Sequence, residues 1–253
     1  MSSDHRKFQR TVSALLSERS ADSFCLYFNK REIISMTISE LKQKSGAKLF
    51  ASILGKSTIS KESEEYATIS RFSEILLENG YGIIHGGYTG GAMSAASDSA
   101  NHYINKHNLS QCLNIAVPQK QHDNLWERVR EAQFTDTAED IFQRLKIVTS
   151  GDIAIVCPQG GDGTELEETI VFHENVIHEE MNKHGGHNEK VTPLIFFQTK
   201  NGTDWKCLIE TKIKVLDILV KNMSDYKWLH FVNSFEEFEK IIKDIKKELG
   251  QII

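Results

Sequence analysis

From about Lys48 onward, short apolar runs alternate with longer segments in which apolar residues recur every three or four positions. Short runs are typical of buried strands, and the longer period is typical of helices packed on a sheet. We expect strands at 48–54, 81–84, 113–117, 153–157, 191–197 and 229–232, with helical segments between them. Strands separated by helices need crossover connections. The pattern therefore predicts a doubly wound, mostly parallel α/β sheet with helices on both faces.

Two parts of the chain lie outside this alternation. Residues 1–45 are charged and only weakly periodic, and we interpret them as an N-terminal extension. Residues 46–253 are interpreted as a single domain, a length that one hydrophobic core commonly supports. Within that domain the polar stretch 119–136 shows no clear periodicity, and we expect it to be irregular.

Composition excludes several classes of protein. The formal net charge is −5, whereas proteins that mainly bind the phosphate backbone of nucleic acid usually carry a positive balance. No apolar run approaches the ~20 residues that cross a bilayer, and the N-terminus lacks the apolar core of a secretion signal. We therefore expect a cytoplasmic protein that binds neither nucleic acid nor membrane. The cysteines stand far apart, as expected of buried, reduced thiols: Cys25, Cys112, Cys157 and Cys207.

Two glycine-rich loops follow predicted strands and precede predicted helices. The first contains Gly86, Gly87, Thr89 and Gly91, and the second contains Gly160, Gly161, Gly163 and Thr164. Glycine lets the backbone approach a ligand closely, and the helix start behind it offers free N–H groups and partial positive charge, which suit a phosphate. Ligands of doubly wound sheets bind beyond the carboxyl ends of the strands, so both loops can face one site.

Each loop also has a simpler interpretation. The first can be a tight strand-to-helix turn that needs glycine only for packing. In the second, Thr164 and Glu167 have the spacing of a capping box, in which Glu167 serves the helix start alone. Neither loop matches the Walker pattern or the dinucleotide fingerprint, which argues against P-loop ATP hydrolysis and against NAD binding.

The second loop and the residue Glu167 resemble the Gly-Gly-x-Gly-Thr-x-x-Glu core of the LONELY GUY (LOG) family, once labelled lysine decarboxylase-like. The first loop is similar to the other glycine motif of that family. The segment 141–144 precedes Gly160 at about the spacing of the family's arginine segment. The similarity in element order covers about residues 48–249. It implies a Rossmann-like fold and a homodimer.

The resemblance also implies a reaction. LOG proteins are phosphoribohydrolases, which hydrolyse the N-glycosidic bond of nucleoside 5′-monophosphates, such as cytokinin ribosides, to a free base and ribose 5-phosphate. No metal or other cofactor is expected. Glu167 would stabilise positive charge on the sugar and activate water, and Arg144 would steady the base, the sugar or Glu167 itself. The phosphate would lie on backbone N–H groups of both loops, with the Thr89 and Thr164 hydroxyls donating. Glu168 is interpreted as a solvated helix residue.

A second interpretation stays open because the chain departs from the family pattern at three positions. Tyr88 replaces a glycine, Gln159 stands where proline is usual, and Leu145 stands where lysine often follows the arginine. These departures also suit a carrier or sensor of the same superfamily that binds a nucleotide or a pterin cofactor without catalysis.

Two further features have competing interpretations. Glu174 and His178 are four residues apart on a predicted helix, but His173, His184 and His187 do not share their face, so we expect no zinc site. Trp126, in the irregular stretch, either covers a base pocket or packs in the core.

Overall fold

The structure is a computed structural model that describes residue 40 and residues 47–250, with gaps at 110, 112, 123–124, 130–131, 133, 136, 186 and 217–222. The predicted extension, residues 1–45, therefore lies outside the described residues except for Glu40. Every described residue belongs to the unit Met36–Ile253.

Seven parallel strands form one sheet, in the order β4-β3-β2-β1-β5-β6-β7. The strands are β1 (Leu49–Leu54), β2 (Tyr81–His85), β3 (Asn114–Ala116), β4 (Phe134–Thr135), β5 (Ile153–Val156), β6 (Leu194–Phe197) and β7 (Leu229–Val232). The helices are α4 (Glu64–Glu78), α5 (Gly91–His107), α6 (Ile141–Val148), α7 (Asp162–His184), α8 (Trp205–Leu216) and α9 (Phe235–Gly250), with 3₁₀ turns η1 (Lys120–His122) and η2 (Met223–Asp225).

Strand β1 stands in the middle of the sheet because the chain changes direction there. Strands β2, β3 and β4 extend to one side of it, and after β4 the chain crosses back to place β5 on the other side. Ser52 of β1 pairs with Ile84 of β2, and Leu54 pairs with Val156 of β5. All three strands are buried along their whole length, as expected for the centre of a sheet covered on both faces. In such sheets the switch in direction marks the usual ligand site.

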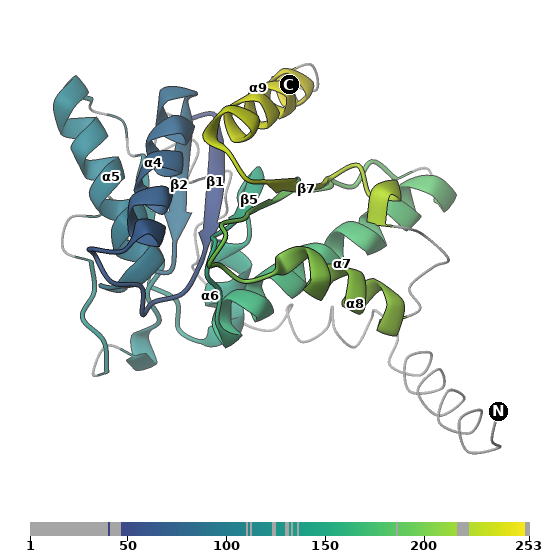
Figure 1. The fold of residues 1–253 in the computed structure, drawn as a ribbon, viewed down its shortest axis with the longest axis horizontal. Coiled ribbons are helices and arrows are strands. Elements are labelled where there is room, and N and C mark those ends of the chain that lie inside the picture. The colour runs from purple at the N-terminus through teal and green to yellow at the C-terminus, as the bar shows by residue number, and fades with distance from the viewer. Residues whose placement is uncertain are drawn as a thin grey trace. The chain divides into compact units, whose positions relative to one another are not determined.

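The two faces of the sheet are covered by different helices (Figure 1). Consecutive residues of β6 show this, because neighbouring side chains of a strand point to opposite faces. Phe197 packs on Phe72 of α4 and Phe238 of α9, with ring centroids 5.8 and 5.9 Å apart, whereas Phe196 packs on Trp205 of α8 at 5.7 Å. Helices α4 and α9 therefore share one face, and α8 covers the other.

The predicted fold class is confirmed, and so is the order of the main elements. The expectation for 119–136 was partly wrong: Phe134–Thr135 forms the edge strand β4 on β3, too short to leave a periodic pattern. Cys157 is buried, but Cys207 is exposed, contrary to expectation. The sequence pattern predicts a helix at about 205–220, of which residues 217–220 lie outside the described residues, as do Cys25 and Cys112.

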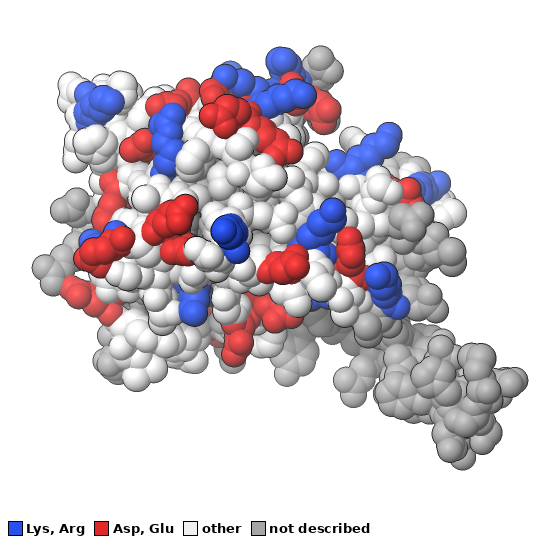
Figure 2. Space-filling model, in the orientation of Figure 1, with Lys and Arg blue, Asp and Glu red and all other residues white. Residues whose placement is uncertain are grey.

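Charges on the visible surface are mixed. Figure 2 shows acidic and basic side chains interspersed on the face in view, without a continuous basic area. Among the described residues, no helix combines the length and the apolar composition needed to span a membrane.

Candidate functional site

The loops that follow β1, β2 and β5 meet at the carboxyl edge of the sheet. Lys56, just after β1, joins the other two: its backbone N–H donates to the Gln159 carbonyl at 3.2 Å, and its carbonyl accepts from the Ala92 N–H at 2.9 Å. Gly55 lies between the loops so closely that a Cβ there would strike Ala92 and Cys157. The two glycine loops are therefore neighbours, joined through a third loop.

The first loop uses three of its N–H groups to hold its own shape. The N–H of Gly87 donates to Nδ1 of His85 at 3.2 Å, that of Gly90 donates to the Ser94 hydroxyl at 2.7 Å, and that of Thr89 donates to the Glu127 carbonyl at 2.8 Å. Positive φ angles of 84° at Gly87 and 118° at Gly90 make these turns possible and favour glycine there. The Thr89 hydroxyl also donates to the Glu127 carbonyl, at 3.1 Å.

A buried polar network supports the first loop from below. His85 is fully buried, and burial lowers its pKa to about 4, so the ring is neutral at pH 7. Because Nδ1 accepts from Gly87, Nε2 carries the proton and donates to Oδ1 of Asn114, 2.9 Å away. The Asn114 amide in turn donates to Ser97 and Asn101, each at 2.9 Å. The turn is therefore fixed by side chains that the sequence analysis did not identify.

The second loop leaves its N–H groups open. Helix α7 begins with Gly161 as its N-cap, in extended conformation and without a side-chain cap. Thr164 is therefore not the N-cap, and Glu167 does not cap the helix, so the capping-box interpretation is wrong. Among the described residues, none accepts from the N–H groups at 161–164, whereas Gly160 N–H donates to the Thr203 hydroxyl at 3.2 Å. Four donors at this helix start thus remain free for a ligand.

Arg144 and Glu167 form a buried ion pair beside these loops. Nη1 of Arg144 lies 3.2 Å from Oε1 of Glu167, with side-chain exposures of 14% and 9%. Arg144 Nη2 also donates to the Gly86 carbonyl at 3.4 Å, which ties the pair to the first loop. Nε of Arg144 is buried without a partner, and Oε2 of Glu167 has none among the described residues. The pair therefore keeps unused hydrogen-bonding capacity.

Burial makes Glu167 easy to protonate. It raises the pKa of this carboxyl to about 7, although the Arg144 guanidinium opposes the shift. The Cys157 thiol lies nearby, and burial and the Glu167 charge together raise its pKa. A carboxyl that changes charge near neutral pH beside open backbone donors has the properties of a general base or acid. Of the predicted residues, Arg144 thus contacts both Gly86 and Glu167.

Glu168 has a different role from the one expected. It is not solvated: its side chain is fully buried, and its Oε2 pairs with Nζ of Lys212. Burial raises its pKa, and Lys212 opposes that rise. Lys212 comes from α8, so this ion pair joins α7 to α8.

Trp126 lies over the first loop and does not pack in the core. Its side chain is 53% exposed, and its ring makes edge contacts with Tyr88 and His122 at centroid distances of 5.5 and 4.7 Å. The buried Tyr88 hydroxyl donates to the Gln119 carbonyl at 2.7 Å and accepts from the Gln119 N–H at 2.6 Å. Tyr88 thus points toward Gln119 and ties that residue to the first loop.

Metal-binding chemistry has no obvious place in the part of the chain that the structure describes. No three His, Cys, Asp or Glu side chains gather there as metal ligands would. His178 contacts the Lys190 carbonyl through Nδ1 at 2.7 Å, and His184 contacts Glu180 at 3.4 Å. The residues described do not place these histidines on one centre.

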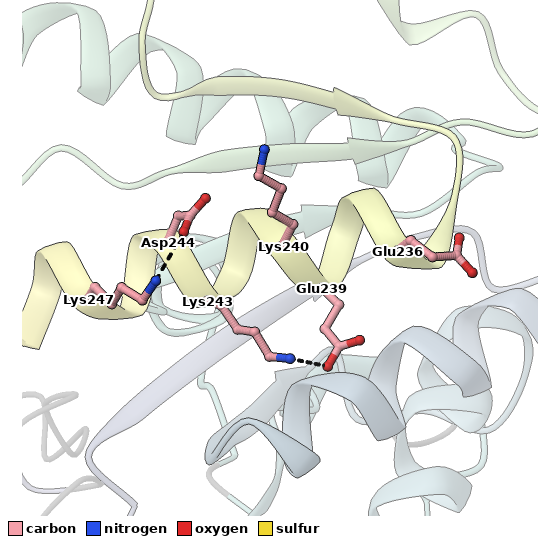
Figure 3. A pocket seen from close by; sticks show the side chains of 6 residues that line it. All are labelled: Glu236, Glu239, Lys240, Lys243, Asp244 and Lys247. Atoms are coloured by element: carbon pink, nitrogen blue, oxygen red, sulfur yellow. Dashed lines mark hydrogen bonds and ion pairs between the residues drawn. The ribbon is translucent and has the colours of Figure 1, made fainter.

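A hollow along α9 is separate from the candidate site. Six charged residues of that single helix line it: Glu236, Glu239, Lys240, Lys243, Asp244 and Lys247. Figure 3 shows Lys243 reaching Glu239 and Lys247 reaching Asp244, while Lys240 points away from both pairs. This is a solvated helix face whose charges are largely paired within the helix.

Sequence reasoning missed the loop after β1. Its signal is the single glycine Gly55 directly after a buried strand, followed by Lys56, Ser57 and Thr58. This Gly-Lys-Ser-Thr run lacks the upstream glycine of a Walker loop, since Phe50 of β1 stands at that position. The two glycine-rich loops stand out in the sequence, whereas the loop after β1 that connects them does not.

Comparison with known proteins agrees with this architecture. No family model and no curated protein matches the chain. Solved structures do match. A Moco carrier protein from Chlamydomonas reinhardtii has a TM-score of 0.53 and 12% identity, and the match covers 79% of this chain and 99% of that one. The protein TM1055 has a TM-score of 0.53 and 14% identity, and the match covers 78% of this chain and 99% of that one. A molybdenum cofactor binding protein from Rippkaea orientalis is also similar, with a TM-score of 0.52 and 15% identity over 78% of this chain and 97% of that one. The chain therefore shares the Rossmann-like α/β fold of these structures.

Proposed function

We propose that the chain binds a nucleoside 5′-monophosphate at the carboxyl edge of β1, β2 and β5 and hydrolyses its N-glycosidic bond. The observation that carries this proposal is the buried Arg144–Glu167 pair beside two glycine loops, with a Glu167 pKa of about 7. The resemblance of the second loop and Glu167 to the LOG motif supports the same conclusion.

Each group has a defined role in this reaction. The carboxylate of Glu167 takes a proton from water as the water oxygen bonds to the anomeric carbon. The bond from that carbon to the base breaks, and its electron pair leaves with the base, which takes up a proton. Negative charge on Glu167 also favours the positively charged sugar of the transition state. Arg144 holds Glu167 in position and keeps part of its population ionised at neutral pH.

Phosphate binding would position the distant bond. The open N–H groups at 161–164 suit a phosphate, and holding it fixes the sugar relative to Glu167. The exposed ring of Trp126 on the first loop suits contact with a flat base.

A second candidate function is carriage of a pterin-type cofactor without catalysis. It is favoured by the names of similar structures, two of which are a molybdenum cofactor carrier and a molybdenum cofactor binding protein. A carrier would use the same open donors at the α7 start for the cofactor phosphate. It would not need a carboxyl that titrates near pH 7.

One experiment separates the two functions. The purified chain is incubated with a panel of nucleoside monophosphates, and released base is measured by chromatography. Hydrolysis predicts free base and ribose 5-phosphate from at least one member of the panel, and none from the matching nucleosides. Tight binding of a phosphorylated pterin, with no base released from any monophosphate, would replace the hydrolase by the carrier.

We also propose that the protein forms a homodimer through α7. Leu166, Ile177 and Met181 are exposed at 46, 44 and 36%, and their helical spacing places them on one side of that helix. Light scattering should give twice the monomer mass, and Ile177→Glu should shift the equilibrium toward monomer. A wild-type monomer at high concentration would contradict the proposal.

A further inference from the structure

Lys56 lies where the three loops meet. Its backbone is held between the other two loops by the bonds to Gln159 and Ala92. The backbone of the following residue, Ser57, lies against Gly90 and Gly91 so closely that a Cβ on either would strike it. The position of Lys56 is therefore fixed by the fold and is not that of a mobile surface lysine.

The Lys56 side chain runs past the start of α7. A Cβ at Gly161, the N-cap, would lie 3.8 Å from Cγ of Lys56. The residue is partly buried, and no carboxylate of the described residues forms an ion pair with its ammonium group. The acidic residues in the first turn of α7 form no ion pair with it: Glu165 lies 3.8 Å from Lys212, and Asp162 is exposed with no ion pair among the residues described. A cation held beside a helix start without a counter-charge is suited to an anionic ligand.

The two glycine loops differ in what they offer such a ligand. The first loop donates N–H groups to protein acceptors at Gly87, Thr89 and Gly90. The start of α7 donates none of those at 161–164 to the described residues. Thr164, only 3% exposed, also has a hydroxyl with no partner among them. The free donors therefore gather on the side where the Lys56 side chain lies.

Lys56 is separate from the acid–guanidinium pair. Arg144 is the cation that lowers the pKa of Glu167, and Lys56 takes no part in that shift. The two cations thus lie in different places: Arg144 lies at the Glu167 carboxylate, and Lys56 lies beside the start of α7. This separation suits a ligand with an anionic end and a reacting or recognised end.

We propose that the Lys56 ammonium binds the phosphate of the ligand at the start of α7, and so selects phosphomonoesters over their unphosphorylated counterparts. The inference rests on the proposed function only in that the site takes a phosphorylated ligand. It holds for a hydrolase and for a carrier alike. A doubly charged phosphate meets one lysine charge and the partial positive charge of the helix start.

Titration calorimetry with ribose 5-phosphate, ribose and inorganic phosphate tests this. Lys56→Met keeps the aliphatic stem beside Gly161 and removes the charge, and Lys56→Arg keeps the charge. Lys240→Met, at an exposed lysine of α9, is the matched control. We expect wild type to bind ribose 5-phosphate and not ribose, Lys56→Met to weaken that binding by about 10- to 100-fold, and the arginine variant and the control to stay within a few-fold of wild type.

The outcomes are distinguishable. Equal affinity of Lys56→Met and wild type for ribose 5-phosphate, in a variant with an unchanged melting temperature, would overturn the role of Lys56. So would equal binding of ribose and ribose 5-phosphate by the wild type. Binding that depends on Lys56 without release of base from any monophosphate would support the role of Lys56 while ending the hydrolase proposal.

Discussion

The guanidinium of Arg144 occupies the space that a side chain at Gly86 would need. A Cβ built on Gly86 falls on Nη2 of Arg144, which itself donates to the Gly86 carbonyl at 3.4 Å. Because Gly86 has no side chain, the guanidinium of Arg144, from α6, can lie against the first loop. The glycine is required at this position for the packing of an arginine and independently of any phosphate.

Gly86→Ala should therefore reduce catalysis more than stability. The added methyl group displaces the flexible end of Arg144, which removes the partner of Glu167 at small cost to the fold. We expect base release to fall at least 10-fold and the free energy of unfolding to change by less than about 1 kcal/mol. Gly250→Ala, at the last residue of α9, is the control, because nothing lies within 4 Å of its Cβ position. Equal activity in both variants would contradict this packing argument.

Gly160→Ala should destabilise the protein. Its Cβ would enter the indole of Trp205, which is buried at 2% exposure and donates its ring N–H to the Cys157 carbonyl at 2.9 Å. A rigid buried ring cannot move aside as an arginine end can, so we expect a loss of about 1 to 3 kcal/mol in urea denaturation. A midpoint like that of Gly250→Ala would show that the ring has room to shift.

Glu167→Gln should abolish hydrolysis while the chain stays folded. The amide cannot take a proton from water and carries no charge for the sugar, so base release should fall by about 100-fold or more. In the wild type, the rate should rise with pH and level off above about 7, where Glu167 is ionised. Steady-state rates between pH 5 and 9 provide the measurement. A rate that falls as pH passes from 6 to 8 would assign Glu167 the role of a proton donor.

The same substitution should change how stability depends on pH. The folded-state pKa of Glu167 is raised from 4.5 to about 7, so its contribution to stability is present below about pH 4.5 and is lost as pH rises to 7. His85 acts in the opposite sense: its folded-state pKa is lowered to about 4, so its contribution is present above pH 6.5 and is lost as pH falls toward 4. In the wild type, these two groups therefore change the free energy of unfolding with pH in opposite directions.

Removing the Glu167 contribution leaves that of His85. The free energy of unfolding of Glu167→Gln, relative to wild type, should therefore increase between pH 4.5 and 7 by on the order of 3 kcal/mol. Urea denaturation at each pH measures it, and Glu165→Gln, at an exposed carboxyl of the same helix turn, is the control. Parallel curves for Glu167→Gln and wild type would show that the Glu167 pKa is not raised on folding.

The alternating pattern predicted the sheet because strand burial and helix periodicity are local properties. β4 was missed because two residues leave no period, and its pairing with β3 depends on distant parts of the chain. The start of α7 was placed near Thr164 because capping residues dominate such predictions. The helix begins two residues earlier, after an extended glycine that supplies no side-chain cap.

The site was predicted in part, for a different reason. The family resemblance named Arg144 and Glu167, and the structure brings them to 3.2 Å across 23 positions of sequence, a distance that no local pattern contains. Lys56 and Asn114 escaped notice because no local motif marks them. Lys56 lies in a loop with a single glycine after β1, and Asn114 lies inside β3. Glu167 and Glu168, which the sequence presents as equivalent neighbours, are both buried but differ in partner: Glu167 pairs with Arg144 and Glu168 with Lys212.

The hydrogen bonds within the first loop have a consequence for how a ligand arrives. A turn already held by His85, Ser94 and Glu127 has little freedom left to lose. Association should then carry only a small entropic penalty from the backbone, and little rearrangement should delay it. The first loop is therefore expected to stay rigid when a ligand binds, and any adjustment is expected in long side chains such as Lys56 and Arg144.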